Sequence, residues 1–295
     1  MEIYSVAQKR PVQVNSIQVI ESLDYFSAML RITTPNPLFG TEFTVPKIEG
    51  GRISFVVFMS DFNDNMFVTY MYPKPFFNLY QKIFSGFTGF STVEKLATSL
   101  GFKYDGPKTL STYWDLPKTS LRKTLTQLTR FASVDGGGAP HFYVNLYNNF
   151  QCVDYKYSIE KMKPAIIQAV TTRTRYSTEW WTQIPGDFQF VKFFPDGTEI
   201  ENYTVRKGSL YAQVSCYLAT RDATNILNQA YSNQYYEYYY TTNQVNVSLQ
   251  YAGGFGLGQS VTLTDNDTPM VVRARTTTMS TEDTNTQTLE LVSPM

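Results

Sequence analysis

The segment Ser133–Tyr143 (SVDGGGAPHFY) combines three consecutive glycines with the only histidine of the chain, residue types that can build a phosphate-binding loop. Such a loop needs backbone amides that lead into the N-terminus of a helix, with a lysine following. Here the glycines follow a predicted helix and lead into a predicted strand, which is the reverse order. Gly136, Gly137 and Gly138 are therefore predicted to form a structural hinge that ends the helix and turns the chain.

His141 is a candidate general base or metal ligand. Catalysis by a histidine also needs an orienting partner and a nucleophile. Asp135 is near in sequence, but nothing marks a neighbouring serine or cysteine as a nucleophile. The sequence therefore predicts a structural histidine, or one that contacts a neighbour in an assembly.

Two further segments match known binding motifs only in part. Asp61–Asn65 (DFNDN) begins like a calcium loop, but Met66 and Tyr72 stand where glycine and glutamate are needed. A hairpin turn is the favoured interpretation, and metal binding there is left open. Gly254–Gly258 (GFGLG) resembles a dinucleotide loop but leads into a strand instead of a helix. We therefore predict no catalytic residue, no cofactor-binding residue and no metal ligand.

The segment Glu179-Trp180-Trp181 suggests a sugar platform beside a carboxylate, as in a cell-wall hydrolase. Glycosidases need a second carboxylate across the bond they cleave, and adjacent residues of a strand face opposite ways. Carbohydrate chemistry is therefore disfavoured. Trp114, Trp180 and Trp181, together with His141, are instead candidate contacts in an assembly.

The composition favours a β-rich protein that buries surface in an assembly. Of 295 residues, 42% are hydrophobic, 16% aromatic and only 17% charged. The 25 basic and 25 acidic residues balance and form no basic stripe, which argues against nucleic-acid binding, sequence-specific or general. Cys152 and Cys216 are too few for a disulfide scaffold and are expected to be small core residues on strands.

Targeting signals are not evident in the sequence. The N-terminus lacks the apolar segment of a secretory signal, and the longest apolar run, Ile53–Met59, is too short to span a bilayer. We expect a protein without a membrane-spanning segment that is made in a cytoplasm and not exported.

Residues 1–90 are predicted to be β-rich. The expected strands are rich in Val, Ile, Phe and Tyr and are separated by Pro, Gly and Asn; they are Val12–Ile20, Ala28–Thr33, Arg52–Ser60 and Met66–Tyr72. Proline cannot donate to a strand ladder, so Pro73-Lys74-Pro75 is expected to end this run.

Residues 91–157 show a different pattern, which predicts an α/β insert. Ser91 and Glu94 are placed as the capping box of a first helix. A second helix is expected to open at Pro117, with leucines at i, i+4 and i+7 over 121–128. A hairpin follows, formed by His141–Tyr147 and Phe150–Tyr157.

Residues 158–295 are predicted to be a second β-rich region with one helix. The helix is expected after Asp222, and Tyr235–Tyr240 (YYEYYY) is interpreted as its end running into a strand. The expected strands are Phe188–Phe194, Thr198–Val205, Leu210–Leu218, Gln244–Tyr251, Ser260–Asp265, Met270–Thr278 and Thr286–Val292.

Two stretches carry the patterns of a known family. The first contains VEKLATSLGFKYDG and TLSTYWDLPKTSLRKTLTQLTRFASVDGGGAPHFYVNLYNNF: a helix, a polar segment, a second helix near a Trp and a hairpin. The second is GLGQSVTLTDNDTPMVVRARTTTMSTEDTNTQTLELV, a glycine before a Val-rich strand, then a Val-Val strand and a Thr-rich hairpin. Both resemble the baseplate hub proteins of contractile phage tails and the related N-terminal module of type VI secretion spike proteins. The first ninety residues match no motif of that family.

The resemblance implies a mainly β fold with an α/β insert: two tube-protein-like β-barrel domains plus a helix–helix–hairpin module. It implies a structural protein of the virion and not an enzyme. Three copies would form a homotrimeric ring that adapts a three-fold spike to the six-fold tail tube and nucleates tube assembly. The implied partners are the tail tube protein, a tail spike or puncturing protein and other baseplate proteins. Few charges and many aromatic residues suit the interfaces of such a ring.

Two alternatives are kept. A tail-tube or tube-initiator protein shares the barrel but would normally need one copy of it, without the insert at 91–157. A cell-wall-degrading tail enzyme should show a carboxylate pair or a metal cluster.

Overall fold

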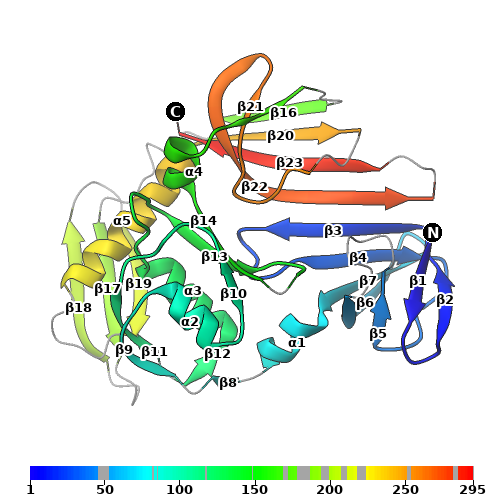
Figure 1. Ribbon diagram of the computed structural model, residues 1–295, viewed down its shortest axis with the longest axis horizontal. Helices are drawn as coiled ribbons and strands as arrows, with labels where there is room; N and C mark the ends of the chain where they lie inside the picture. Colours follow the sequence, from blue (N-terminus) through cyan, green and yellow to red (C-terminus); the bar gives the residue numbers. More distant parts are fainter. Residues whose placement is uncertain are drawn as a thin grey trace.

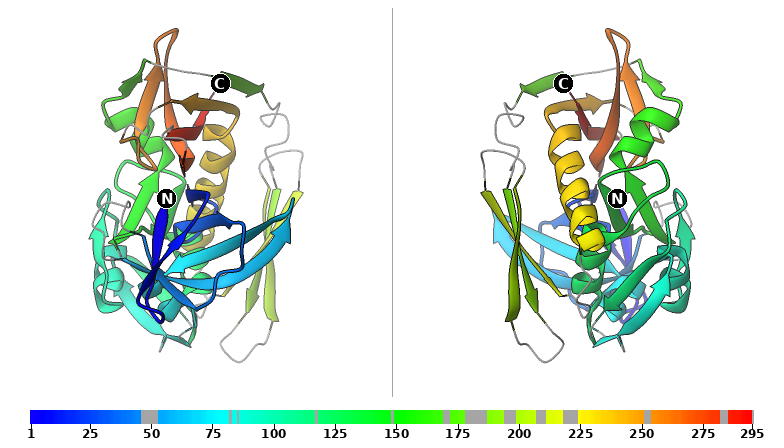
Figure 2. Two further views of the ribbon diagram at one scale, coloured as in Figure 1. Left: turned by 90° about the vertical axis from the view of Figure 1, so that its right-hand side faces the viewer. Right: turned by 90° about the vertical axis from the view of Figure 1, so that its left-hand side faces the viewer.

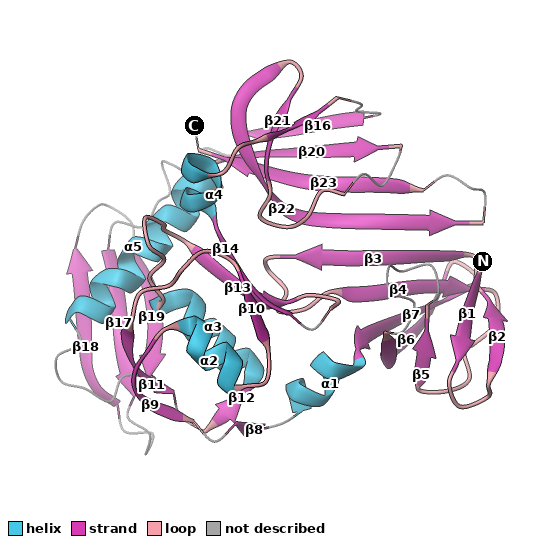
Figure 3. Ribbon diagram, in the orientation of Figure 1, coloured by secondary structure: helices cyan, strands magenta, loops and turns pink. Residues whose placement is uncertain are grey.

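The computed structural model describes residues 1–45, 53–81, 83–84, 86–116, 118–147, 149–168, 172–177, 187–193, 199–206, 211–217, 224–250, 254–281 and 285–294. Strands dominate this part of the chain (Figure 3), which confirms the prediction of a mainly β fold. Among the described helices, none is long and apolar enough to cross a membrane.

One 13-stranded sheet runs through the molecule (Figure 1). Its spatial order is β16 (Thr172–Ser177), β20 (Asn243–Leu249), β23 (Thr286–Ser293), β22 (Asn266–Ser280), β3 (Ser16–Ser22), β4 (Met29–Thr34), β7 (Met66–Pro73), β6 (Ser54–Asn63), β5 (Glu42–Thr44), β1 (Glu2–Ser5) and β2 (Arg10–Gln13). β21 (Ser260–Leu263) branches from β22 and carries β15 (Ala165–Ile167) on its other side. No closed barrel is seen among the described residues, and the division into two barrels stays a prediction.

The two β-rich ends of the sequence meet in this sheet. β3 and β22 pair antiparallel from Ser16↔Ser280 to Ser22↔Ala274. Burial alternates along β3, with Ile17 and Val19 inside, as expected of a strand with one face on a core. A separate core lies under each half, and the strand pairing joins the two halves through backbone hydrogen bonds.

The first ninety residues differ from expectation in several places, and β1, β5, β8 (Ile83–Phe84) and β9 (Phe87–Ser91) are strands that were not expected. The predicted strand Val12–Ile20 is broken: β2 ends at Gln13 and β3 begins at Ser16. Asp61 lies within β6, and the turn is formed by Asp64-Asn65 alone, with φ values of +48° and +59°. This confirms a hairpin, with a tighter turn than DFNDN suggests. β7 ends at Pro73 as expected, and a helix not foreseen from the sequence, α1 (Lys74–Gln81), follows.

The insert packs two helices against small sheets. Its elements are β8 (Ile83–Phe84), β9 (Phe87–Ser91), α2 (Val93–Ser99), β10 (Lys103–Asp105), β11 (Thr112–Leu116), β12 (Thr119–Ser120), α3 (Leu121–Phe131), β13 (Pro140–Val144), β14 (Asn149–Asp154) and α4 (Tyr155–Lys161). Leu121, Leu125 and Leu128 are fully buried on one face of α3, as their spacing predicts. β13 and β14 form the expected antiparallel hairpin, with Phe142 opposite Cys152.

Both predicted helix starts in the insert are wrong. Thr92, and not Ser91, caps α2 by accepting the N–H of Lys95. Glu94 turns away from the cap, because its carboxylate accepts hydrogen bonds from the backbone and the hydroxyl of Thr109. α3 begins at Leu121, where the hydroxyl of Ser120 accepts the N–H of Lys123; Pro117 lies outside the described residues.

The remaining elements are a three-stranded sheet and a long helix. The sheet has the order β18 (Glu199–Arg206), β17 (Asp187–Phe193), β19 (Tyr211–Tyr217), and Cys216 lies on β19. α5 (Thr224–Tyr240) packs against α3, α4 and β23, and contains all of Tyr235–Tyr240. The views in Figure 2 show it between the insert and the upper part of the large sheet. The expected cap Asp222 lies outside the described residues.

Candidate functional site

His141 lies on β13, and its ring meets Glu237 of α5. The Nε2–Oε2 distance is 2.5 Å, and the two side chains are 12% and 23% exposed. Burial alone would lower the pKa of His141, but the charge and hydrogen bond of Glu237 outweigh it, so the pKa is raised above the usual 6.5. The ring of Tyr155 flanks the imidazole at a centroid distance of 4.9 Å. The pair is an ionic link between the hairpin and the long helix.

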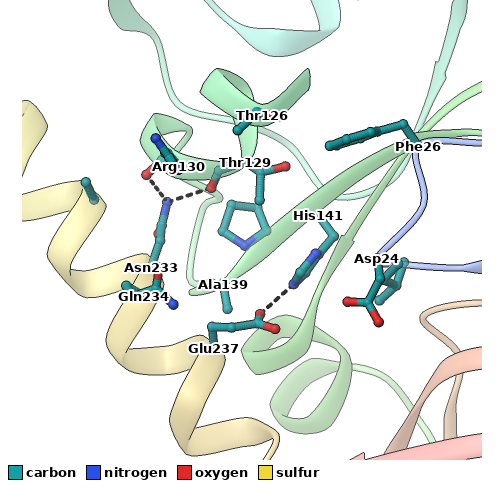
Figure 4. A pocket seen from close by; sticks show the side chains of 13 residues that line it. Asp24, Phe26, Thr126, Thr129, Arg130, Ala139, His141, Asn233, Gln234 and Glu237 are labelled. Carbon is teal, nitrogen blue, oxygen red and sulfur yellow. Dashed lines mark hydrogen bonds and ion pairs between the residues drawn. The ribbon is translucent and has the colours of Figure 1, made fainter. Parts of the chain in front are cut away.

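A cavity of about 260 Å³ lies beside this pair (Figure 4). Its walls come from the segment before β4, from α3, from the start of β13 and from α5; they are formed by Leu23, Asp24, Phe26, Thr126, Thr129, Arg130, Ala139, Pro140, His141, Ala230, Asn233, Gln234 and Glu237. The cavity therefore marks the junction between the first β-rich region, the insert and the second β-rich region.

Asn233 closes one wall of this junction. Its amide nitrogen donates to the carbonyl oxygens of Arg130 and Ala132, at 3.0 and 2.9 Å, and lies 3.3 Å from that of Thr129. These carbonyls are at the C-terminal end of α3, where no further turn of helix satisfies them. α5 thus caps α3 with a side chain that is 4% exposed.

A second charged contact ties the large sheet to the same region. Arg273 of β22 donates from Nη2 to Asp24 at 2.9 Å, and its Nη1 lies 3.4 Å from Glu290 of β23. Burial raises the pKa of Glu290, and the charge of Arg273 opposes that shift. The imidazole and the two carboxylates near the cavity are therefore engaged with partners in the chain. Among the described residues, no group of three or more His, Cys, Asp or Glu side chains is placed to hold a metal.

We expect the His141–Glu237 pair to make stability depend on pH. A histidine whose folded-state pKa is raised stabilises the fold fully below its usual pKa, and this contribution is lost as the pH rises through the raised value. The free energy of unfolding should therefore fall as the pH rises from about 6.5 through the raised pKa of His141, and His141→Gln should lack this component. Since the chain has one histidine, NMR titration of its ring protons reads the pKa directly. A pKa below the usual value would contradict the ion pair.

The three glycines occupy the turn between α3 and β13. Only Gly136 has a φ in the left-handed region, +72°. Gly137 is restricted by space, because an added Cβ would lie 2.7 Å from the carboxyl group of Asp154 and from Val134. A Cβ on Gly138 would overlap the ring of Tyr236 on α5. The turn therefore lets two other elements approach the backbone closely.

Asp154 is the residue that this turn surrounds. Its carboxylate accepts the N–H of Gly138 at 2.8 and 2.9 Å and that of Tyr157 at 2.8 Å, which caps α4. Burial raises the pKa of Asp154 to about 6, although these hydrogen bonds act in the opposite direction. One buried side chain thus holds the glycine turn and the start of α4 together.

The other residues singled out from the sequence lie apart from this junction. Trp114 of β11 is 2% exposed and donates from its indole N–H to the carbonyl of Ser91 at 3.0 Å, so it belongs to the core of the insert and not to an outer surface. Trp180 and Trp181 lie outside the described residues. Cys152 is buried as expected, and burial raises the pKa of its thiol.

Sequence reasoning missed Asn233, Glu237 and Arg273. Glu237 had one available signal, since it is the only charged residue in the 17 residues of α5. A single acidic residue in a Tyr-rich helix and the single histidine of the chain can form an ion pair when both are partly buried. Asn233 and Arg273 carried no comparable signal. The carbonyls that Asn233 contacts and the Asp24 partner of Arg273 are about a hundred or more residues away, and nothing in the sequence marks Glu290 as the nearer partner of Arg273.

The sequence matches no protein-family model, and it matches no curated protein. Its structure is similar to solved tail proteins along the whole chain. The tail protein from Neisseria meningitidis MC58 has a TM-score of 0.63 and 8% identity, with 99% of this chain and 95% of that chain covered. The prophage MuSo2 43 kDa tail protein from Shewanella oneidensis has a TM-score of 0.61 and 12% identity, with 99% and 98% covered.

A third similar structure is the E. coli c3393 protein, a component of the type VI secretion system with structural similarity to the T4 tail proteins gp27 and gp5. Its TM-score is 0.53 at 8% identity, with 100% of this chain and 77% of that chain covered. The chain thus has the fold of solved tail proteins, and the resemblance seen in the sequence is confirmed at the level of fold.

Proposed function

We propose that this protein is a structural component of a phage tail tip or baseplate, assembled in the host cytoplasm and retained in the virion tail. The observation that carries the proposal is the fold similarity to tail proteins, which extends over nearly the whole chain and not over one module. The junction described above supports it, because His141, Glu237 and Arg273 form ion pairs within the chain. These charged residues therefore stabilise the fold.

The more specific role is a trimeric hub ring. The chain contains two β-rich regions, each with its own core, and these would act as two tube-protein-like units. Three copies then present six units on one face, which fits a six-fold tail tube, and keep three-fold symmetry for a spike on the other. Neighbouring copies would bury aromatic surface, and obligate interfaces of this kind commonly exceed roughly 2,000 Å². In this role the ring nucleates tube polymerisation and also contacts other baseplate proteins.

The experiment that tests this role measures mass and activity together. Light scattering of the purified protein should give three chain masses, and electron microscopy should show a ring with two similar β units per chain. Incubation with peptidoglycan should give no turnover. A monomer that cleaves peptidoglycan, and loses that activity on Glu179→Gln, would replace the hub by the tail-enzyme alternative. A hexameric ring would favour a tail-tube protein.

A further inference from the structure

β6 has a free outer edge over its second half. β5 pairs with β6 only over Ser54–Val56, and one further hydrogen bond runs from the N–H of Val57 to the carbonyl of Thr41 at 2.9 Å. Phe58 is the extra residue of a β-bulge; from Met59 to Asn63, β6 pairs with β7 on one side, its side chains are exposed, and no described strand pairs with the other side. Figure 2 shows this hairpin, in light blue, reaching away from the N-terminal strands.

The register with β7 identifies the backbone groups that point outward. The turn Asp64-Asn65 has positive φ at both residues, which is a type I′ turn, so Asn63 and Met66 form the first hydrogen-bonded pair. Bonded and non-bonded pairs alternate along an antiparallel ladder. The amides and carbonyls of Ser60 and Phe62 therefore point away from β7, toward the free edge.

This edge is only partly protected against pairing: a β-bulge lies at its start, between Val57 and Met59, and Asp61 adds one charge, but the strand is long and carries neither proline nor lysine. Protected edges are short, or carry proline or lysine, as β2 does with its four residues and Pro11. The free half of β6 instead exposes Phe58 by 39% and Phe62 by 57%. Among the described residues, the Asp61 carboxylate covers part of this edge, because it accepts the N–H of Phe62 at 2.8 Å. Open backbone groups beside exposed aromatic rings are typical of a site that receives an added strand.

The strand that suits this edge is β16, the terminal strand at one end of the same sheet. It pairs with β20 on one side, with no described strand on the other. Its sequence, TRTRYS, has two arginines and no acid, whereas β6 and its turn carry Asp61 and Asp64 and no base. The charges of the two strands are thus complementary.

We propose that copies of this chain join by backbone pairing between Phe58–Phe62 of β6 and β16 of the next copy. The contact joins two different surfaces, so it is head-to-tail, and such contacts close into rings when the rotation allows. The large sheet would then continue from one subunit into the next. This inference rests on the proposed ring and adds the contact that closes it.

The first test removes one outward amide. Ser60→Pro deletes the N–H that faces the free edge and leaves the β6–β7 ladder bonds in place, which is where strands tolerate proline. Ser60→Ala is the matched control, because it loses the same hydroxyl contact to Thr69 but keeps the amide. We expect Ser60→Pro to be a monomer with native circular dichroism and Ser60→Ala to remain a trimer. A folded Ser60→Pro trimer would overturn the contact and leave the hub proposal standing, whereas a monomeric wild-type protein would overturn both.

The second test locates the partner strand and does not depend on how well Ser60→Pro folds. In a background in which Cys152 and Cys216 are replaced by alanine, the double variant Ser60→Cys/Thr174→Cys, treated with a short bis-maleimide, should give covalent trimers on a denaturing gel, while either single variant should give none. Covalent dimers from Ser60→Cys alone would show β6–β6 pairing and overturn the proposal. A double variant that stays monomeric on the gel would overturn it as well.

Discussion

Arg275→Met should lower the free energy of unfolding by about 3–5 kcal/mol. Arg275 lies on β22 and forms an ion pair with Glu21 of β3, across the strand pairing that joins the two β-rich ends of the chain. Glu21 is 4% exposed, and Nη1 of Arg275 also donates to the carbonyl of Phe255 at 2.7 Å. Removal of the guanidinium leaves a buried carboxylate without its counter-charge, which costs more than the intact pair contributes.

Two variants control this prediction. Glu21→Met/Arg275→Met should recover most of the loss, because it removes both charges from the interior. Lys74→Met breaks the more exposed Lys74–Glu42 pair, with side chains 45% and 21% exposed, and should change stability by no more than about 1 kcal/mol. The measurement is urea unfolding of the four proteins under one set of conditions. A loss below about 1 kcal/mol for Arg275→Met would mean that the pair does not stabilise the junction.

Gly137→Val should cost about 3 kcal/mol or more and should prevent ring formation. The first added carbon already lies 2.7 Å from the Asp154 carboxyl group, so that carboxylate must move. It then loses its hydrogen bonds to Gly138 and Tyr157, and with them the cap of α4. Overpacking and the loss of the α4 cap affect the same small region, and both lower the free energy of unfolding.

Gly254→Val is the matched control, because no described residue lies within 4 Å of a Cβ at that position. It should stay within about 0.5 kcal/mol of the wild-type protein. The readouts are thermal unfolding and mass in solution. If Gly137→Val were as stable as Gly254→Val, the predicted hinge role of the three glycines would be wrong.

Much of the fold could be predicted because the spacing of apolar residues depends on the local secondary structure. The strand pattern placed β23 within one residue and found the middle of β22, which extends further at both ends, and the leucine spacing identified the buried face of α3. The helix starts failed because several side chains compete for one cap. Ser91 is the last residue of β9, and Thr92 is the N-cap of α2. The carboxylate of Glu94 accepts a hydrogen bond from Thr109, 15 residues further along the chain.

The candidate site was less predictable because its parts come from distant segments. His141 was visible in the sequence, but its partner Glu237 is 96 residues away, on a helix whose composition suggested only a tyrosine-rich surface. The glycines were recognised, whereas the reason for two of them was not. Glycine is required at positions 137 and 138 because Asp154 and Tyr236 lie too close for a Cβ. Close contacts between distant segments produce no periodic pattern in the sequence, so they could not be predicted from it.

The pairing of β3 with β22 also determines when the sheet can be completed during protein synthesis. Gln18 and Thr278, which face each other across this pairing, are 260 residues apart. At the ~5–20 residues per second of protein synthesis, roughly ten to fifty seconds separate the emergence of the two strands from the ribosome. During that interval β3 can pair with β4, but its other edge has no native partner and is open to strands of neighbouring nascent chains. Slower growth at low temperature, or a chaperone that holds the first ninety residues, should therefore raise the yield of folded protein more than any change in the helical insert.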